Sequence, residues 1–587
     1  MAKWFVSAKK ADFNGIGEKY HISPVLARII RNRDIVEDSE IERYLHGSME
    51  DIYDGSLMKD MRKAVDILWE KIQGGKKIRV IGDYDVDGIC AAYILKKGLS
   101  LCGADVDTVI PHRIKDGYGI NEQLIQDAFE EGIDTIVTCD NGIAAHGQIA
   151  YANTLGITCI VTDHHEVPYE MVEGEKHYIL PPAAAVIDPK QEECSYPYKN
   201  ICGAVVAWKL VLKLWETVRV SEEDKREILE FAGIATVCDV MELLDENRIL
   251  VKEALKSMSH SANLGLRCLI RVHDLNPNAL SAYHIGFVLG PCFNATGRLD
   301  TAARTLELLE CKNEREAILI AAELKRLNES RKEMTEKGVE DAVLKIEEEG
   351  LEKDSVMVLY LPECHESLAG IIAGRIREKY YKPVFILTKS EECVKGSGRS
   401  IETYSMYEEL NKCKDLFLKF GGHKMAAGLS LEEKNVEKFR KTLNENCSLT
   451  KEDMEEKILI DVPMPLSYVT EDFLKELELL EPFGTGNPKP VFACKDLKFL
   501  SIRIMGKNKN MAKFSVEDGQ GNRFSIVCFR HLEKFLEDVG NKYGQEILDL
   551  FLNQNKHSGV KMSVIYYPSL NEYMGKREIQ YVMQNWS

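Results

Sequence analysis

The sequence predicts an α/β protein in which a parallel-sheet domain is joined by a long helix to a second α/β domain, with a small C-terminal β-barrel. Three observations predict this class. Strand-like and helical segments alternate from about residue 60 to 190, a helical segment without Pro spans about 301–350, and short strands follow residue 455. At 587 residues the chain is too long for one hydrophobic core, so several domains are expected.

The composition is that of a globular protein, with 45% hydrophobic and 29% charged residues. No apolar run has the length of a membrane helix, and the first residues lack the apolar stretch of a signal peptide. The sixteen cysteines form no C-x-x-C pair, which favours a reducing, cytoplasmic location without membrane binding. A net charge of −18 argues against coating nucleic acid with the whole surface but permits a local basic groove.

The first 50 residues predict a helical extension. Ser23-Pro24 begins one short helix, "SPVLARIIRNR", and "DSEIERYL" predicts another. Neither contains a motif with recognisable chemistry. We therefore expect this segment to pack onto the domain that follows it.

Residues 51–300 predict the parallel-sheet domain. Its expected strands are rich in Val and Ile and alternate with helices; they are "KIRVIGD", "DVDTVIPHR", "DTIVTCDNG", "ITCIVTDHH" and "AAAVIDP". This alternation predicts right-handed βαβ crossovers and a parallel sheet covered by helices. Ligands of such sheets bind beyond the carboxyl ends of the strands, so the polar residues at those ends should meet at one edge.

The stretch "RVIGDYDVDG" (79–88) places three acids, Asp83, Asp85 and Asp87, directly after the first strand. Carboxylates this close repel one another unless a cation lies between them, so the stretch predicts half of a metal site. Two alternatives exist. An EF-hand loop would need Glu at its twelfth position, which is Ile94, and a solvated acidic turn would have no function.

Further candidate ligands follow the other predicted strands. Asp140 follows the third strand, and Asp163, His164 and His165 follow the fourth. The two histidines could instead be a hydrogen-bonded core pair or a solvent-facing pair, but their position after an Asp at a strand end favours function. Asp239 follows an apolar segment and would by itself be an ordinary helix or turn acid.

Oxygen ligands with an imidazole suit Mn²⁺ or Mg²⁺, and the lack of a thiolate set disfavours structural zinc. Five or six ligands exceed the need of one ion that also binds substrate and water. Two ions are the simpler interpretation. Such a pair shares a bridging carboxylate and stabilises the entering and leaving oxygens of a phosphoryl displacement.

Four motifs, "DYDVDG", "CDNG", "DHH" and "CDV", resemble in order and spacing those of the DHH phosphoesterase family. Four further stretches resemble its RecJ branch, the single-strand-specific 5′-to-3′ exonucleases: "PHRIKDGYG" (111–119), "GPCFNATGRLDTA" (290–302), "SGRS" (397–400) and "GGHKMAAG" (421–428). Together they cover nearly the whole chain, and such a set is far more specific than any single motif.

The resemblance implies a role for each candidate residue. The implied metal ligands are Asp83, Asp85, Asp87, Asp140, His164 and Asp239, with Asp140 bridging the two ions. Asp163 is implied to orient an imidazole and His165 to contact the scissile phosphate. Two departures from the family pattern are Cys292, where Arg is expected, and Asp116, where Glu is usual.

Residues 301–350 predict one connecting helix, and residues 351–452 predict a glycine-rich second α/β domain. We expect "KGSGRS" and "FGGHKMAAG" to form glycine-rich turns whose N–H groups and cationic side chains suit a terminal phosphate. The resemblance implies that the 5′ phosphate or backbone is bound by Arg113, Arg298, Ser397 and Arg399, with Asn294 and His423 nearby. Such a clamp would fix which bond is cut.

Residues 453–587 predict an OB-like barrel of five or six strands with one intervening helix, "RHLEKFLEDVG". Basic and aromatic residues adjoin one another, as in a stacking platform for single strands, although aromatics of a small barrel are more often core. The pairs are Lys513-Phe514, Arg523-Phe524, Phe529-Arg530, Tyr566-Tyr567 and Lys576-Arg577. RecJ proteins carry an OB domain at this place, which favours the platform.

The sequence thus predicts a Mn²⁺- or Mg²⁺-dependent exonuclease that degrades single-stranded DNA from its 5′ end, releases 5′-mononucleotides and serves DNA repair and recombination. We expect a monomer that works with a helicase and a single-strand-binding protein. One alternative is a DHH phosphodiesterase for short RNA or cyclic dinucleotides, although such enzymes are generally shorter and lack the barrel. Another is an inactive scaffold, which would be expected to lose acids that are all present here.

Overall fold

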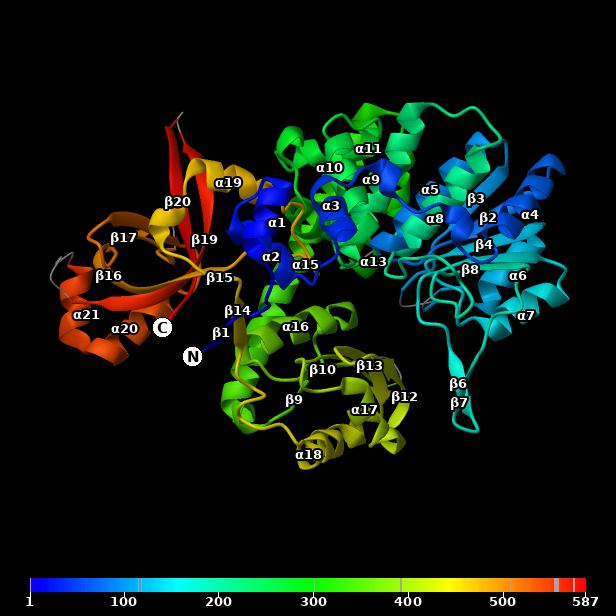
Figure 1. Cartoon of the computed structure of the whole chain (residues 1–587). Coiled ribbons are helices and arrows are strands. Elements are labelled where there is room, and N and C mark those ends of the chain that lie inside the picture. Colours follow the sequence, from blue (N-terminus) through cyan, green and yellow to red (C-terminus); the bar gives the residue numbers. More distant parts are fainter. Residues whose placement is uncertain are drawn as a thin grey trace. The chain divides into compact units, whose positions relative to one another are not determined.

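A computed structural model describes residues 2–113, 116–117, 119–299, 301–390, 393–506, 508–553, 559–573 and 576–587. The chain divides into two compact units (Figure 1). The larger unit comprises Ile52–Met241 and Leu250–Glu455, and the smaller unit comprises Met1–Asp51, Glu242–Ile249 and Glu456–Ser587. No helix in the described ranges is both long enough and apolar enough to cross a bilayer.

The larger unit contains a five-stranded parallel sheet in the order β3-β2-β4-β5-β8. Its strands are β2 (Lys77–Ile81), β3 (Asp105–Val109), β4 (Thr135–Cys139), β5 (Thr158–Thr162) and β8 (Ala185–Ile187). Apolar side chains of α6 (Glu122–Glu130) and α7 (His146–Thr154) pack on one face, and α5 (Val86–Leu101) and α8 (Gly203–Trp215) lie on the other (Figure 1). The predicted parallel sheet is confirmed.

Further elements complete this part of the larger unit. An exposed hairpin of β6 (Tyr169–Val172) and β7 (Glu175–Tyr178) follows β5. The helices around the sheet and after it are α4 (Met61–Gln73), α9 (Glu222–Cys238), α11 (Leu264–Val272), α12 (Ala282–His284), the π-helical turn η4 (Ile285–Leu289) and α13 (Gly290–Leu299). The helix α10 (Asp245–Met258) begins in the smaller unit and continues in the larger unit from Leu250.

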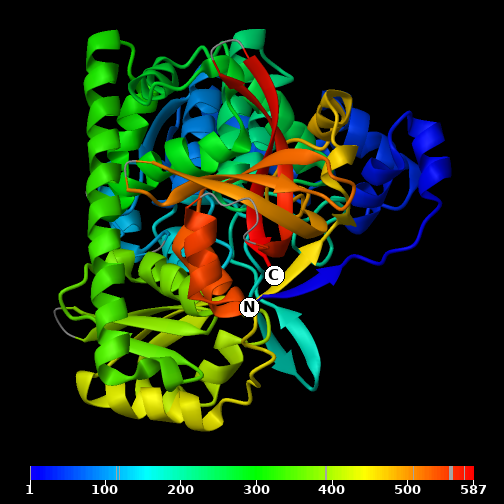
Figure 2. The same ribbon diagram turned by 90° about the vertical axis from the view of Figure 1, so that its left-hand side faces the viewer.

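The single helix predicted for residues 301–350 is wrong in one respect, because the structure divides it into α14 (Ala303–Glu310) and α15 (Glu314–Glu349). Asn313 begins α15 by accepting hydrogen bonds from the backbone N–H groups of Arg315 and Glu316. Asn followed three residues later by Glu is a helix-start signal that was available in the sequence. Figure 2 shows α15 as one long rod beside the second sheet.

The second sheet has the order β12-β13-β11-β10-β9. Its strands are β9 (Met357–Tyr360), β10 (Val384–Lys389), β11 (Val394–Arg399), β12 (Phe417–Gly422) and β13 (Ala426–Leu431), with α16 (Ala369–Tyr380), α17 (Met406–Asn411) and α18 (Val436–Asn446) around them. The expected glycine-rich turns are wrong, because "KGSGRS" lies on β11 and most of "GGHKMAAG" on β12 and β13. On β11, a Cβ atom at Gly396 would lie 2.4 Å from Leu387 Cδ2, so the glycines allow close packing against the core.

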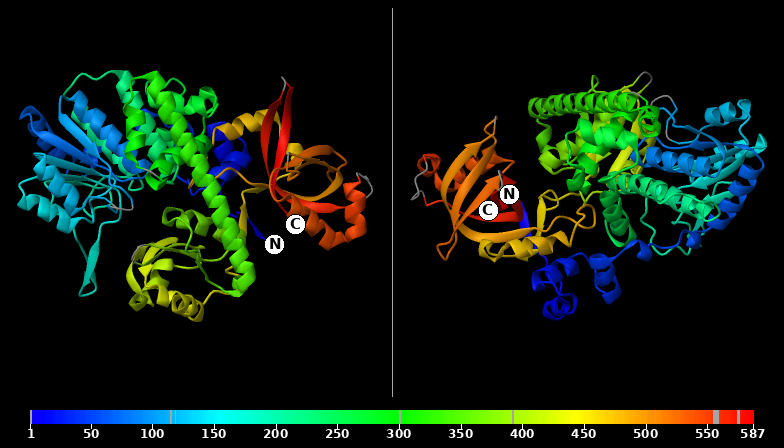
Figure 3. Two further views of the ribbon diagram at one scale, coloured as in Figure 1. Left: turned by 180° about the vertical axis from the view of Figure 1, so that it is seen from behind. Right: turned by 90° about the horizontal axis from the view of Figure 1, so that it is seen from above.

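The smaller unit contains a closed barrel (Figure 3). Five strands follow one another in the order β16-β17-β18-β20-β19, and pairing of β16 with β19 closes the circle. They are β16 (Phe492–Met505), β17 (Met511–Glu517), β18 (Arg523–Cys528), β19 (Lys561–Tyr573) and β20 (Lys576–Trp586). The barrel prediction is confirmed, except that two helices, α20 (Leu532–Tyr543) and α21 (Gln545–Leu552), replace the single one expected.

Most rings expected to form a stacking platform belong instead to the barrel core. Phe514 and Tyr566 are fully buried, and Phe524 packs against the same core. Among the described side chains of the five pairs, Phe529 is an exposed ring, with 43% of its surface accessible. Neighbouring residues of a strand face opposite sides, so a basic-aromatic pair places the ring inside and the charge outside.

The N-terminal segment packs mainly with C-terminal residues, contrary to the expectation that it packs onto the next domain. β1 (Lys3–Val6) pairs in parallel with β14 (Lys457–Ile460). Apolar side chains of α2 (Pro24–Asn32) and α3 (Asp38–His46) join the core that includes the barrel and α19 (Glu471–Glu478), and α1 (Phe13–Tyr20) packs against it. The physical reason is that the apolar faces of these short helices pack against apolar side chains that lie far along the chain.

Candidate metal centre and arginine cavity

The three alternating acids lie where β2 ends and α5 begins. Asp85 is the N-cap of α5 and accepts hydrogen bonds from the N–H groups of Asp87 (2.9 Å) and Gly88 (3.1 Å). A Cβ atom at Gly88 would lie 2.4 Å from the backbone nitrogen of Asp83, so only glycine allows the helix to start this close to the strand. Because Ile94 is buried within α5, the segment is not an EF-hand loop.

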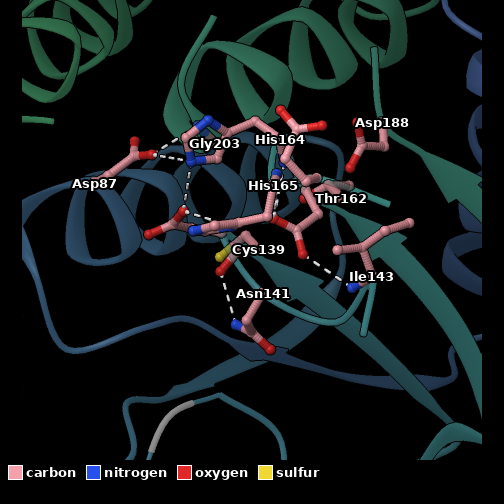
Figure 4. A network of polar contacts seen from close by, with 12 residues as sticks. Asp87, Cys139, Asn141, Ile143, Thr162, His164, His165, Asp188 and Gly203 are labelled. Carbon is pink, nitrogen blue, oxygen red and sulfur yellow. Dashed lines mark hydrogen bonds and ion pairs between the residues drawn. The ribbon is translucent and has the colours of Figure 1, made fainter. Parts of the chain in front are cut away.

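The N-terminus of α8 fixes the carboxylate of Asp87. Gly203 N–H donates to Asp87 Oδ2 (2.6 Å) and Ala204 N–H to Oδ1 (2.8 Å). Two N–H groups of a helix start stabilise a carboxylate, and Figure 4 shows Asp87 and Gly203 beside His164. The sequence interpretation missed Gly203 and Ala204, since nothing in the sequence places α8 against α5.

Asp140 follows β4 in the left-handed conformation, with φ of 59°. The next residue, Asn141, donates to the carbonyls of Ile81 (3.1 Å) and Cys139 (2.8 Å) and thereby ties the ends of β2 and β4 together. A non-glycine residue in this region is uncommon and is typical of functional positions. The turn directs Asp140 toward the histidine that follows β5.

His164 lies at the centre of the cluster. Its Nε2 is 3.1 Å from Asp140 Oδ1, 3.5 Å from Asp87 Oδ2 and 3.7 Å from Asp239 Oδ2. Three sets of ligand atoms converge within 4.8 Å, namely Asp83-Asp85-Asp140, Asp87-His164-Asp239 and Asp140-His164-His165. The structure therefore brings together all six residues expected to hold metal.

A further contact beside the cluster joins the buried Asp163 to the half-exposed His165. Asp163 Oδ1 is 2.7 Å from His165 Nδ1, while Asp163 Oδ2 accepts from Ile143 N–H at 2.9 Å. Burial lowers the pKa of His165, but the hydrogen bond and charge of Asp163, together with Asp239 and Asp87, outweigh it and raise the pKa to about 9. The geometry thus allows Asp163 to orient a protonated imidazole.

Of the acids of this cluster, Asp83, Asp87 and Asp140 are buried and Asp85 and Asp239 are half-buried, although like charges repel one another there. Burial and the neighbouring carboxylates raise the pKa of Asp83, Asp85 and Asp140, and raise that of Asp239 to about 8. Among the described residues, Asp83 Oδ1, His164 Nδ1 and Asp239 Oδ2 are buried atoms without a hydrogen-bond partner. Oxygen-rich donors that repel one another and keep unused lone pairs fit divalent cations.

Asp188 is an additional acid that the sequence interpretation missed. It follows β8, and burial together with the charge of Asp163 raises its pKa to about 8. Lys190 N–H donates to its Oδ1 at 2.7 Å. The signal was present, because the rule that placed acids at the ends of β2, β4 and β5 applies equally to β8.

A cavity of about 530 Å³ adjoins the metal centre through Tyr84, the residue between Asp83 and Asp85. Its lining includes Lys395, Ser397 and Arg399, three alternate residues of β11. Arg113 and Arg298 also line the cavity, and the Arg113 guanidinium carbon is 4.5 Å from the centre of the Tyr84 ring. The glycines of β11 therefore face the core, while the polar residues between them face the cavity.

Like charges crowd this cavity. Burial lowers the pKa of Arg298 to about 10, and the nearby Arg113, Arg331 and Arg399 add to this effect. Glu366, an acid of the described lining, lies 3.0 Å from Lys395 and leaves the arginines uncompensated. Lys395 and Lys419 were missed in the sequence, whereas the expected Asn294 and His423 do not line the cavity.

The fold and these two sites define a class, the DHH phosphoesterases. Family models match the DHH family N-terminal domain at residues 77–236, the DHHA1 domain at 353–449 and the RecJ OB domain at 460–585. Family models thus match three separate parts of the chain.

The RecJ exonuclease of Bacillus subtilis is 31% identical over 99% of this chain and 70% of its own length. RecJ of Salmonella typhimurium is 31% identical over 96% of both chains. The crystal structure of Thermus thermophilus RecJ in complex with Mn²⁺ superposes with a TM-score of 0.81 at 26% identity, covering 100% of this chain and 79% of that one. The chain belongs to the RecJ family of single-stranded-DNA-specific exonucleases.

Proposed function

We propose that this protein hydrolyses single-stranded DNA from its 5′ end and releases 5′-mononucleotides, in DNA repair and recombination. The observation that carries the proposal is the meeting, within one unit, of an acid cluster suited to divalent cations and an arginine cavity that adjoins it at Tyr84. A phosphodiester bond at the metal centre and a terminal phosphate in the cavity would satisfy both sets of charges.

Asp83, Asp85, Asp87, Asp140, His164 and Asp239 would hold two Mn²⁺ or Mg²⁺ ions, with Asp140 shared between them. When bound, these ions supply positive charge that acidifies water and stabilises phosphate oxygens. Asp87 is pre-oriented for this task by the N-terminus of α8. His165, held by Asp163, donates a hydrogen bond to the scissile phosphate.

The clamp determines which bond is cut. Arg113, Arg298, Ser397 and Arg399 bind the 5′ phosphate, because several guanidinium groups around one cavity suit a dianion that accepts many hydrogen bonds. Lys395 and Lys419 add charge to the same cavity. Since the clamp and the metal centre share one unit, a bound chain end places the same phosphodiester at the metals in every cycle.

The wider assignment follows from the family. We infer a cytoplasmic monomer that works with a helicase and a single-strand-binding protein. The sixteen unpaired cysteines support a reducing location. The C-terminal barrel has a fold that binds single strands in other proteins, which supports binding of the substrate strand.

A digestion of single strands labelled at either end tests the proposal. With Mn²⁺, the 5′ label should be released first and as a mononucleotide, whereas internal fragments or loss from the 3′ end would contradict it. Asp140→Ala should abolish hydrolysis. Asp105→Ala, which changes an exposed acid at the opposite edge of the sheet, is the matched control and should hydrolyse normally.

A further inference from the structure

Two aromatic rings stand exposed on the short helical segment after Asn276. Tyr283 of α12 and Phe287 of the π-helical turn η4 are 59% and 65% exposed. Their rings stack with centroids 5.0 Å apart and an angle of 25° between their planes. Large exposed apolar rings that are paired in this way mark a binding surface more often than isolated ones do.

The segment that carries these rings packs against the end of the helix that supplies Asp239. The Cys238 thiol lies 3.9 Å from the Ile285 carbonyl oxygen, and a Cβ atom at Gly290 would lie 2.3 Å from Cys238 Sγ. Asp239 is the C-cap of α9, so η4 borders the last turn before the metal centre. π-helical turns occur frequently at functional sites.

The backbone beside Asp239 is also unusual. Val240 has a φ of 59° and is 66% exposed. A β-branched residue in the left-handed region is strained, and such strain persists where a neighbouring position requires it. Exposed apolar side chains therefore lie both on α12 and η4 and on the turn after α9, which meet beside Asp239.

The size of the pair restricts its occupant. Aromatic side chains bury about 150–250 Å² each, so the exposed parts of both rings offer roughly 200–300 Å². A stable protein partner buries about 800 Å² on each side and would have to contact many further residues, whereas one base needs only the two rings. One flat heterocyclic base matches the area and extends the ring stack by another layer.

We propose that Tyr283 and Phe287 form a stacking platform for one unpaired base of the substrate strand, next to the metal centre. This inference rests on the proposed function. His284, whose Nδ1 is 2.9 Å from Ser281 Oγ, lies edge-on to Tyr283 with ring centroids 5.8 Å apart and holds the platform in place. Bases of a duplex are already stacked and paired, so the platform favours single strands.

A cycle of protein and substrate changes tests the platform. Base stacking on an aromatic ring is worth roughly tenfold in binding, so an abasic site at one position should raise KM by about that factor. Phe287→Ala should raise KM for the intact strand similarly and should make the enzyme indifferent to the abasic site at that position alone. Phe287→Tyr should restore both values, and Leu319→Ala, which removes another exposed apolar side chain of the unit, is the control.

A second measurement does not depend on turnover. With Asp140→Ala and Mn²⁺, 2-aminopurine at the sensitive position should be quenched on binding, and adding Phe287→Ala should remove the quenching. If Phe287→Ala responds to every abasic position as wild type does and the quenching remains, the platform is wrong. If wild-type protein releases no mononucleotide, the proposed function fails, while the fluorescence still decides the platform.

Discussion

The larger unit buries two clusters of like charge, one negative and one positive. At the metal centre, four carboxylates have raised pKa values; in the cavity, burial and other arginines lower the pKa of Arg298. The cations near the acids, among them His165 and Arg113, do not offset burial and mutual repulsion, and Tyr84 separates the two clusters. The sign of each buried cluster therefore indicates its ligand, a divalent cation in one case and a phosphate in the other.

The largest effect is expected from Asp140→Asn, which tests whether the negative cluster binds a divalent cation. Hydrolysis should fall by at least about a thousandfold because the shared ligand is lost. In EDTA the same variant should melt at a higher temperature than wild type, since one repelling carboxylate is gone. A variant that hydrolyses DNA normally, or that is destabilised in EDTA, would contradict the assignment of this cluster to metal.

Glu230 is a buried acid outside the metal centre, so it shows how a buried acid behaves without a cation. Ser257 and Ser261 donate to its carboxylate, and burial raises its pKa from 4.5 to about 7. The folded state thus binds more protons between these values, and stability falls by up to about 3 kcal/mol as pH rises from 4.5 to above 7. Urea unfolding across this pH range should show a fall in stability that is smaller in Glu230→Gln than in wild type by about this amount, because the other buried acids contribute equally to both proteins.

Ligand-induced stabilisation should follow the two clusters separately. Mn²⁺ at a hundred times its Kd should raise the free energy of unfolding by about 2.7 kcal/mol. Phosphate at a hundred times its own Kd should raise it by the same amount. In thermal melts, Asp140→Asn should lose the response to Mn²⁺ and keep that to phosphate. Arg298→Met should do the reverse. Loss of both responses in either variant would mean that the two clusters are one site.

The smallest expected effect concerns the end group of the substrate. Arg298→Met should raise KM for 5′-phosphorylated strands by about tenfold, since a hydrogen bond to a charged group is lost. KM for strands with a 5′ hydroxyl should change much less. Arg271→Met, at an exposed arginine paired with Glu314, is the control. Equal changes for both substrates would show that the cavity does not read the terminal phosphate.

Sequence reasoning predicted that the acids and His164 converge at one edge, because one rule covered them. Asp83, Asp140 and His164 each follow an apolar run, and parallel strands end at a common edge. The same reasoning misjudged β11, where glycines alternate with Lys395, Ser397 and Arg399. Glycine spacing was attributed to a turn, whereas a strand of period two places glycines on one face and polar residues on the other.

The sequence by itself determined the parallel sheet, the acids at its carboxyl edge and the barrel, since these follow from local periodicity and strand direction. Only the tertiary structure decided that Gly203 N–H reaches Asp87, that β1 pairs with β14 and that Phe514 faces inward. These features join residues that lie far apart in the chain or depend on which face of a strand closes the barrel. Packing selects among such arrangements, and no local pattern encodes the choice.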